Sequence, residues 1–245
     1  MRENSVNQDL FEGQLTWSHA LNGLDKRVLT KLSRSQRDRS LNAGENLFRQ
    51  GELSEEFYIL REGRVRVYKC HESGEEFTFN HCQPDTMLGL AAFLLKRPNA
   101  VSAQAVGSVW FSSITRQDFI ECIEISPCFH KNITEIVASL ALESMTHTTP
   151  LVLDTATARL ANVLLKLSRR KADILYEDET LSSGLQVSQE ELGRMIGTSR
   201  YWVGVTLKKF EQAGWISKSR TSIVIKNRLK LRNVVYSDRL GSQIT

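Results

Sequence analysis

The sequence feature that most constrains the fold is a pair of short helical patterns joined by a glycine, within residues 188–213. Ser188 can cap the first helix, and the glutamate three residues later completes a capping box. Gly197 permits the sharp turn between the helices, and Gly193 allows them to cross closely. Apolar residues recur at helical spacing on the inner sides, namely Leu192, Met195, Ile196, Val203, Leu207 and Phe210. This spacing predicts a helix-turn-helix motif.

The second helix of the motif is predicted to present a mostly polar face outward. Either Thr198 or Ser199 can cap it, and its outward positions are Ser199, Arg200, Tyr201, Val205 and Lys208. Arg200 has forked donors that can bind guanine O6 and N7 together, whereas Lys208 is better suited to a phosphate. Tyr201 and Trp202 can each pack on a thymine methyl or fill the core, and the core is favoured for Trp202.

Basic residues concentrate around this motif. Residues 215–225 form a strand, a basic turn that contains Arg220, and a second strand, which is the pattern of a wing. Residues 188–232 hold 10 Lys+Arg against 3 Asp+Glu. Residues 154–245 hold 16 against 9, whereas residues 1–153 hold 16 against 19. A basic module beside a mildly acidic one indicates a polyanion as partner, and we expect duplex DNA to contact Ser188, Thr198, Ser199, Arg200, Tyr201, Lys208 and Arg220.

The amino-terminal half carries the signals of short strands. From Leu41 to Ile114, glycines separate alternating segments that are rich in β-branched and aromatic residues, such as Val65-Arg66-Val67-Tyr68. His71 to Glu75 is a candidate hairpin turn, with Gly74 available for a positive φ. Several short strands at this spacing predict a β-sandwich or barrel.

Helical periodicity begins after Thr115. Arg116 to Ile125 is predicted as a short helix that stops near Pro127, because the residue before proline avoids helical angles. A longer helix is predicted from Cys128 to about Thr148. Its apolar stripe can pack on its own barrel or form a parallel dimer seam, and the heptad spacing of Ile133 and Leu140, with Ile136 between them, favours the seam.

Pro150 is expected to end the long helix. Asp154, Thr155 or Thr157 can cap a further helix that runs to about Lys171. These signals predict three parts, which are a β-rich domain over residues 1–126, a long helix and hinge over 127–153, and a winged helix-turn-helix over 154–245.

Other classes are disfavoured by composition. The four cysteines, Cys70, Cys82, Cys122 and Cys128, show no Cys-x-x-Cys spacing, so we expect free thiols and no metal site. The longest apolar run, Met87 to Leu95, is shorter than the ~18 residues that a membrane span needs. The first nine residues lack an apolar segment for export, so a cytoplasmic location is expected.

The order of these parts resembles the CRP/FNR superfamily of bacterial transcription regulators. The match covers about Ser18 to Ile225, and its most specific stretch is Glu190-Glu-Leu-Gly-Arg-Met-Ile-Gly-Thr-Ser-Arg200 followed by Val203-Gly204. The resemblance implies an α+β fold with an amino-terminal β-roll of the cyclic-nucleotide-binding jelly-roll type, a long dimerisation helix and a carboxy-terminal winged helix-turn-helix. It also implies a homodimer that binds a DNA palindrome under control of a small-molecule effector, and no enzymatic activity. The family resemblance further implies that the first part, residues 1–126, senses the effector.

The sequence departs from the cyclic-AMP receptor branch in the effector segment. That branch has a glutamate after the glycine and an arginine followed by a serine, whereas here Leu90 follows Gly89, and Ala100 and Val101 occupy the later positions. A cyclic phosphate would lose charge-assisted hydrogen bonds that contribute ~1.5–3 kcal/mol each. An apolar or aromatic effector is therefore expected, in a pocket formed by Leu88, Gly89, Leu90, Ala100, Val101, Ile133, Ile136, Val137 and Leu140.

Several alternatives stay open at this point. The iron–sulfur branch is excluded because its cysteines lie near the amino terminus, whereas the first cysteine here is Cys70. No cofactor is expected, although haem could be held by His71 or His81 in a gas or redox sensor on the same scaffold. The segment Pro84 to Leu95 resembles the halorespiration regulators, which sense chlorinated phenols. A cupin-type enzyme would need a His-x-His pair, which is absent.

The recognition helix also departs from the cyclic-AMP receptor branch. Tyr201 stands where that branch has a glutamate, and Val205 stands where it has a guanine-reading arginine. A different operator is therefore expected. An activator that contacts RNA polymerase is the expected mode of regulation.

Overall fold

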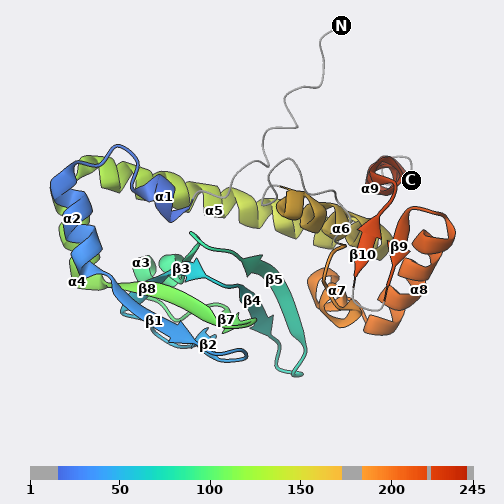
Figure 1. Cartoon of the computed structure of the whole chain (residues 1–245), viewed down its shortest axis with the longest axis horizontal. Coiled ribbons are helices and arrows are strands. Elements are labelled where there is room, and N and C mark those ends of the chain that lie inside the picture. The colour runs from blue at the N-terminus through green and yellow to red at the C-terminus, as the bar shows by residue number, and fades with distance from the viewer. Residues whose placement is uncertain (1–15, 173–183, 220–221, 242–245) are drawn as a thin grey trace, which may run out of the picture. The chain divides into compact units, whose positions relative to one another are not determined.

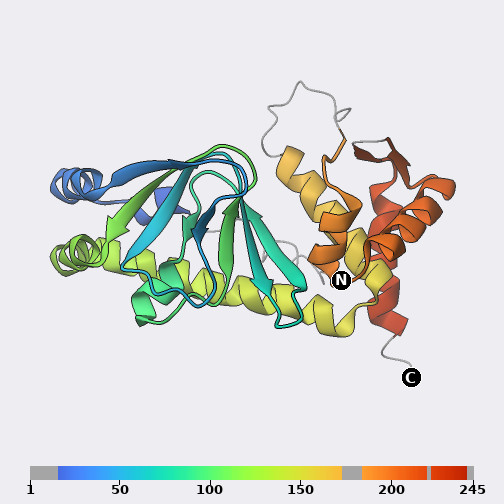
Figure 2. The same cartoon turned by 90° about the horizontal axis from the view of Figure 1, so that it is seen from below.

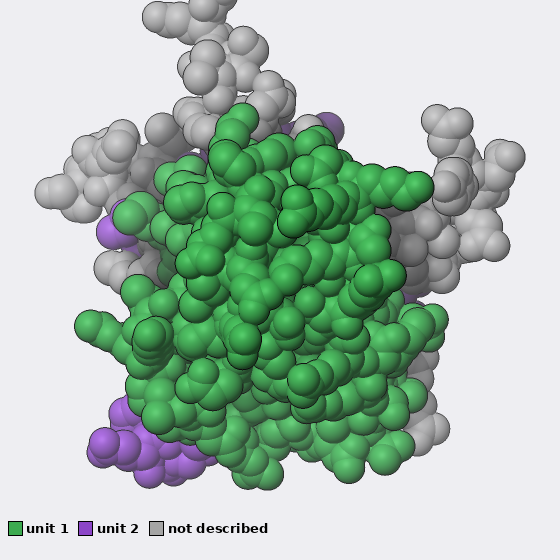
Figure 3. Space-filling view, turned by 90° about the vertical axis from the view of Figure 1, so that its left-hand side faces the viewer, with its two compact units in different colours: residues 1–69, 81–145 green, residues 70–80, 146–245 purple. Residues whose placement is uncertain are grey.

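The computed structural model describes residues 16–172, 184–219 and 222–241 (Figures 1 and 2). The chain divides into two compact units, one made of residues 1–69 and 81–145, and the other of residues 70–80 and 146–245. Figure 3 shows the space-filling surface of the first unit in green. No helix within the described ranges is long and apolar enough to cross a membrane.

The first unit is built on two four-stranded sheets. One has the order β1-β8-β3-β6 and the other the order β2-β7-β4-β5. The strands are β1 (Arg37–Leu41), β2 (Asn46–Phe48), β3 (Glu56–Glu62), β4 (Val65–Cys70), β5 (Glu76–Cys82), β6 (Met87–Leu88), β7 (Ser102–Ala105) and β8 (Val109–Thr115). This confirms the predicted β-roll.

The alternation of strand β3 separates two layers of core. Phe57 and Ile59 pack with helices on one face, whereas Leu60 and the half-buried Tyr58 pack against the other sheet. A strand directs successive side chains to opposite faces, so one seven-residue segment serves both clusters. The hairpin between β4 and β5 turns as predicted, because Gly74 has φ +84° and His71 N donates to Glu75 O at 2.8 Å.

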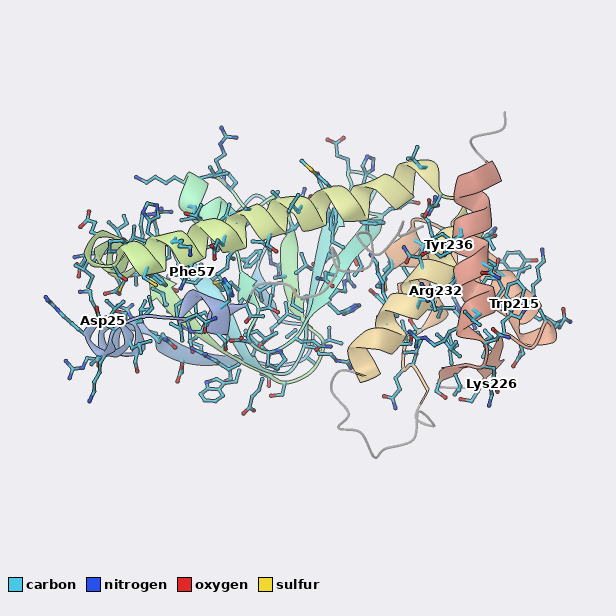
Figure 4. The ribbon with its side chains drawn as sticks, turned by 90° about the horizontal axis from the view of Figure 1, so that it is seen from above. Asp25, Phe57, Trp215, Lys226, Arg232 and Tyr236 are labelled. Carbon is cyan, nitrogen blue, oxygen red and sulfur yellow. The ribbon has the colours of Figure 1, made fainter. Side chains whose placement is uncertain are left out.

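Five helices pack with these sheets. They are α1 (Trp17–Ala20), α2 (Lys26–Ser35), α3 (Leu90–Leu95), α4 (Arg116–Ile125) and α5 (Pro127–Leu153). Helix α4 has the predicted bounds, and the Thr115 side chain caps it by accepting from Asp118 N. Helices α1 and α2 were not predicted, although the Asp25 side chain caps α2 by accepting from Val28 N at 2.9 Å. Trp17 of α1 packs against Phe57 and Phe129, and Figure 4 labels Asp25 and Phe57.

Helix α5 differs from the prediction in where it ends and in what its apolar stripe contacts. It continues through Pro150 to Leu153, so the prediction that Pro150 ends the helix is wrong. A proline inside a helix removes one backbone donor and its ring crowds the preceding turn, which disfavours the helix without ending it here. The favoured dimer seam is also wrong for Ile133 and Ile136, which are 4% and 0% exposed in the core of their own unit. Heptad spacing marks an apolar stripe without indicating which partner covers it.

The second unit contains the predicted helix-turn-helix and wing. Its elements are α6 (Ala156–Ala172), α7 (Gln189–Ile196), α8 (Arg200–Gln212), β9 (Ile216–Lys218), β10 (Ile223–Ile225) and α9 (Arg228–Gly241). Thr155 caps α6, since its Oγ1 accepts from Ala158 N at 3.3 Å. Strands β9 and β10 are antiparallel, and Lys226 N and Asn227 N both donate to Trp215 O at the base of this hairpin. Figure 4 labels Trp215 and Lys226 in this unit.

Candidate nucleic-acid interface and effector site

The turn between α7 and α8 is fixed by caps on both sides. The Ser188 side chain accepts from Glu191 N at 3.0 Å at the start of α7. Gly197 ends α7 in the left-handed region, with φ +65°. Ser199, and not Thr198, caps α8, because its Oγ accepts from Trp202 N at 3.2 Å. The predicted turn chemistry is therefore present.

Two glycines allow the helices to approach each other. A Cβ on Gly193 would lie 2.6 Å from Thr198 O, a distance that real Cβ atoms essentially never show. A Cβ on Gly204 would lie 2.7 Å from Gln189 Oε1. The close approach at Gly193 was expected from the sequence, whereas that at Gly204 was not. The contact at Gly193 is with a backbone atom of the turn, so the path from α7 into α8 depends on the absence of a side chain there, whereas the end of the Gln189 side chain could move away from Gly204.

Helix α8 buries one face and exposes the other. Val203, Leu207 and Phe210 are 0%, 0% and 3% exposed in the core of the unit, as predicted. Trp202 is half-buried and packs against the same core, which agrees with the favoured reading for this residue. The predicted outward residues are all exposed, namely Ser199, Arg200, Tyr201, Val205 and Lys208, and the structure adds Lys209, Glu211 and Gln212, which were not in the predicted set.

Two cations of helix α8, Arg200 and Lys208, are not held in ion pairs by the described acidic residues of the motif. Arg194 pairs with Glu190 at 2.8 Å and approaches Glu191 at 3.8 Å, so the two acidic residues of α7 face one arginine. Within the described ranges, neither Arg200 nor Lys208 forms an ion pair. Exposed, unpaired cations on a helix can approach phosphate without first breaking an internal salt bridge.

The wing is tied to α8. Lys218 N of β9 donates to Glu211 Oε1 of α8 at 3.0 Å, and Ser219 N donates to Ser222 O at 2.8 Å across the turn. A single bridge between Leu185 and Ile223 adds a neighbour to strand β10. Arg220, which we expect to contact DNA, lies outside the described residues.

The structure does not bring the expected effector residues together as one set. Leu88 and Val101 belong to the core between the two sheets. Leu90, Ile133 and Ile136 belong to the core between a sheet and the helices, with Leu140 partly buried beside them. Ala100 and Val137 are exposed. The division occurs where strand β6 ends, because Leu88 is on that strand, whereas Leu90 begins helix α3 after the left-handed Gly89.

The surroundings of Gly89 are aromatic. Gly89 has φ +78°, and a Cβ built on it would meet Phe48 at 3.5 Å, Tyr58 at 3.7 Å and Asn99 Oδ1 at 3.9 Å. The rings of Phe48 and Tyr58 are stacked with centroids 5.9 Å apart, and Phe111 meets Tyr58 edge-on at 5.7 Å. None of these neighbours carries a positive charge that could bind a phosphate.

The two histidines considered for haem are on strand β5 and on the turn that precedes it. His71 is exposed on a hairpin turn, and its Nδ1 is 3.0 Å from Ser73 Oγ, while His81 is half-buried on β5. Among the described residues no group of three or more His, Cys, Asp or Glu side chains could hold a metal ion. None of the four cysteines forms a disulfide bond, and burial raises the pKa of the Cys122 thiol.

Two family descriptions match the chain. Residues 38–126 match the cyclic nucleotide-binding domain, and residues 158–234 match the Crp-like helix-turn-helix domain. The cyclic AMP receptor protein of Thermus thermophilus is 26% identical over 193 residues, which cover 79% of this chain and 85% of that protein. The transcriptional activator protein anr of Pseudomonas aeruginosa is 25% identical over 196 residues, covering 80% of this chain and 79% of the relative.

Solved structures share the fold. FixK2 from Bradyrhizobium japonicum aligns with a TM-score of 0.68 and 21% identity, over 81% of this chain and 96% of FixK2. A CooA mutant from Carboxydothermus hydrogenoformans aligns with a TM-score of 0.70 and 20% identity, over 91% of this chain and 97% of CooA. The two units, in this order along the chain, therefore recur in known proteins.

Proposed function

The chain belongs to the CRP/FNR superfamily of DNA-binding transcription regulators, which are not enzymes, and from this premise we propose that it is a dimeric activator controlled by a small apolar or aromatic effector. The observation that carries the choice of effector is the aromatic surrounding of Gly89, where Phe48 and Tyr58 lie closest. A sugar phosphate placed there would lose its hydration without gaining a charged partner.

The effector is proposed to act through helix α5. Leu90 of α3, which follows Gly89, shares a core cluster with Ile133 and Ile136 of α5. A ligand that changes the packing of α3 would change the packing of α5 as well, because closely packed cores transmit displacement. A coupling free energy of ~1–3 kcal/mol is sufficient to switch DNA occupancy.

The dimer is proposed to use a different face of α5 from the one that the heptad spacing favoured. Val137, Leu142 and Met145 are 38%, 63% and 67% exposed on this helix. Leu142 and Met145 are three positions apart, so they lie on one side of the helix and suit a helix-to-helix contact. In the dimer, two copies of α8 would read successive major grooves, ~34 Å apart, in a palindromic operator. Contact with RNA polymerase would make the protein an activator.

A thermal-shift panel tests the choice of effector. The purified protein is heated with cyclic AMP, with haem, and with aromatic compounds that include chlorinated phenols. A bound ligand at 100 times its Kd adds ~2.7 kcal/mol to stability, which is a measurable rise in Tm. We expect an aromatic compound to raise the Tm and cyclic AMP to leave it unchanged. Saturation by micromolar cyclic AMP, or a Soret band after growth with haem, would contradict the proposal.

The role of Arg200 in sequence reading is tested by Arg200→Ala. Loss of a guanine contact should weaken specific operator binding by ~1–3 kcal/mol while the salt slope changes little. Lys208→Ala is the matched control, since loss of a phosphate contact should lower binding to all sequences and reduce the slope by about one. Fluorescence anisotropy against a salt series separates the two. If Arg200→Ala weakens binding to random DNA equally, Arg200 contacts only phosphate.

A further inference from the structure

Two side chains with large apolar surfaces are exposed on helix α8, the helix labelled in Figure 1. Tyr201 is 81% exposed, and Val205 is 40% exposed. Residues four apart on a helix lie on one face, about one turn from each other. The two side chains therefore form one apolar strip, which we call the Tyr201–Val205 strip.

The core of the unit is complete without this strip. The cluster under α8 is filled by Val203, Leu207 and Phe210, with Trp202 packed at its edge. Neither Tyr201 nor Val205 belongs to that cluster or packs against it. Packing within the unit therefore does not account for an apolar strip at these two positions.

The surroundings of the strip are charged. Arg200 precedes Tyr201, Lys208 follows Val205 by one turn, and both cations are exposed and without an ion pair in the described part of the chain. The segment 188–232 as a whole holds 10 Lys+Arg against 3 Asp+Glu. A polyanion with apolar groups in a groove fits this combination, and the helix-turn-helix that presents the strip is an arrangement that places its second helix in the major groove of DNA.

The major groove of DNA offers such groups. Thymine presents its C5-methyl there, and it is the group of a base pair that an apolar side chain reads by contact. We propose that the Tyr201–Val205 strip reads thymine methyl groups in the operator, while Arg200 and Lys208 supply polar and phosphate contacts. This inference rests on the proposed function, because it assumes that α8 enters the major groove.

The test replaces thymine by deoxyuridine. An operator is first selected from random duplexes with the whole protein. Each thymine of a half-site is then replaced singly by deoxyuridine, which removes one methyl group and keeps every hydrogen-bonding group. Affinity is measured by fluorescence anisotropy. We expect a loss of about fourfold at one or two positions, which corresponds to the ~0.8 kcal/mol of one buried methylene-sized group.

Variants assign the effect to the strip. Tyr201→Ala and Val205→Ala should each make one of the sensitive positions indifferent to the methyl group, whereas Tyr201→Phe, which keeps the ring, should preserve the sensitivity. Lys208→Ala is the control, because it should weaken thymine and deoxyuridine duplexes equally. A melting curve confirms that each variant is folded, which the exposure of Tyr201 leads us to expect.

The outcomes separate this inference from the proposed function. If selection enriches no sequence, sequence-specific binding fails and the inference fails with it. If an operator is enriched and deoxyuridine changes no affinity by more than the error, the strip does not read methyl groups, and the proposed function stands. Equal sensitivity in the wild type and in both alanine variants would also overturn the inference.

Discussion

At the scale of single residues, a glycine determines where helix α8 begins. The glycine is Gly193, because any Cβ there would lie 2.6 Å from Thr198 O, an atom of the backbone. Backbone atoms cannot rotate away as the end of a flexible side chain can. The contact therefore fixes where α8 begins relative to α7, and with it the direction of Arg200.

We predict that Gly193→Ala destabilises the second unit and impairs DNA binding. Overpacking of this kind typically costs ~1–3 kcal/mol. Chemical denaturation followed by tryptophan fluorescence measures the loss. Gly74→Ala is a useful control, since no atom lies within 4 Å of a Cβ there, so only the cost of its positive φ remains. Equal stability of Gly193→Ala and the wild type would contradict the close approach.

Cysteine reactivity is a second prediction at this scale. Burial raises the pKa of the Cys122 thiol from the ordinary 9.0, so this thiol stays protonated where an exposed thiol ionises. Cys70 is exposed and should be alkylated first by iodoacetamide in the native protein, as mass spectrometry of peptides will show. Early alkylation of Cys122 would contradict its burial.

The buried thiol also predicts a pH dependence of stability. Because the pKa of Cys122 is higher in the folded state than the ordinary 9.0, its contribution to the free energy of unfolding is fully present below pH 9.0 and declines as pH rises above it.

At the scale of elements, helix α5 carries apolar side chains that are buried in its own unit and others that are exposed. Ile136 is fully buried in its own unit, whereas Leu142 is 63% exposed. Ile136→Ala should lower the free energy of unfolding by ~2–5 kcal/mol, because it removes buried methyl groups and leaves a cavity. Leu142→Glu should weaken dimerisation without that loss. Denaturation and sedimentation velocity measure the two quantities, and a dimer unaffected by Leu142→Glu would exclude this face.

The elements that sequence alone could predict are those with local signals. Helix α4 was bounded correctly because a threonine cap precedes it and Pro127 follows it. The helix-turn-helix was predicted from its caps, its glycines and the spacing of its apolar residues. Helix α2 carries comparable signals in the Asp25 cap and the buried Val28 and Leu32, yet it was not predicted.

What sequence could not supply is the identity of the partner that covers an apolar face. The same stripe of α5 was expected both to line the effector site and to form the dimer seam, and the structure assigns Ile133 and Ile136 to the core of their own unit. The expected effector residues divide between two core layers for a related reason. Leu88 ends strand β6 and Leu90 begins helix α3, and only the packing of sheets and helices decides which cluster each side chain joins.

For the whole molecule, the central claim is that the chain reads a specific DNA sequence through its basic second unit. The most direct test is the affinity for a selected operator relative to a scrambled duplex of the same length, measured across a salt series. Specific sites are typically bound ~10³–10⁷-fold more tightly than random DNA at physiological salt. The account predicts a preference in this range, with affinity for both duplexes falling as salt rises. Equal affinity for the two duplexes at every salt concentration would contradict it.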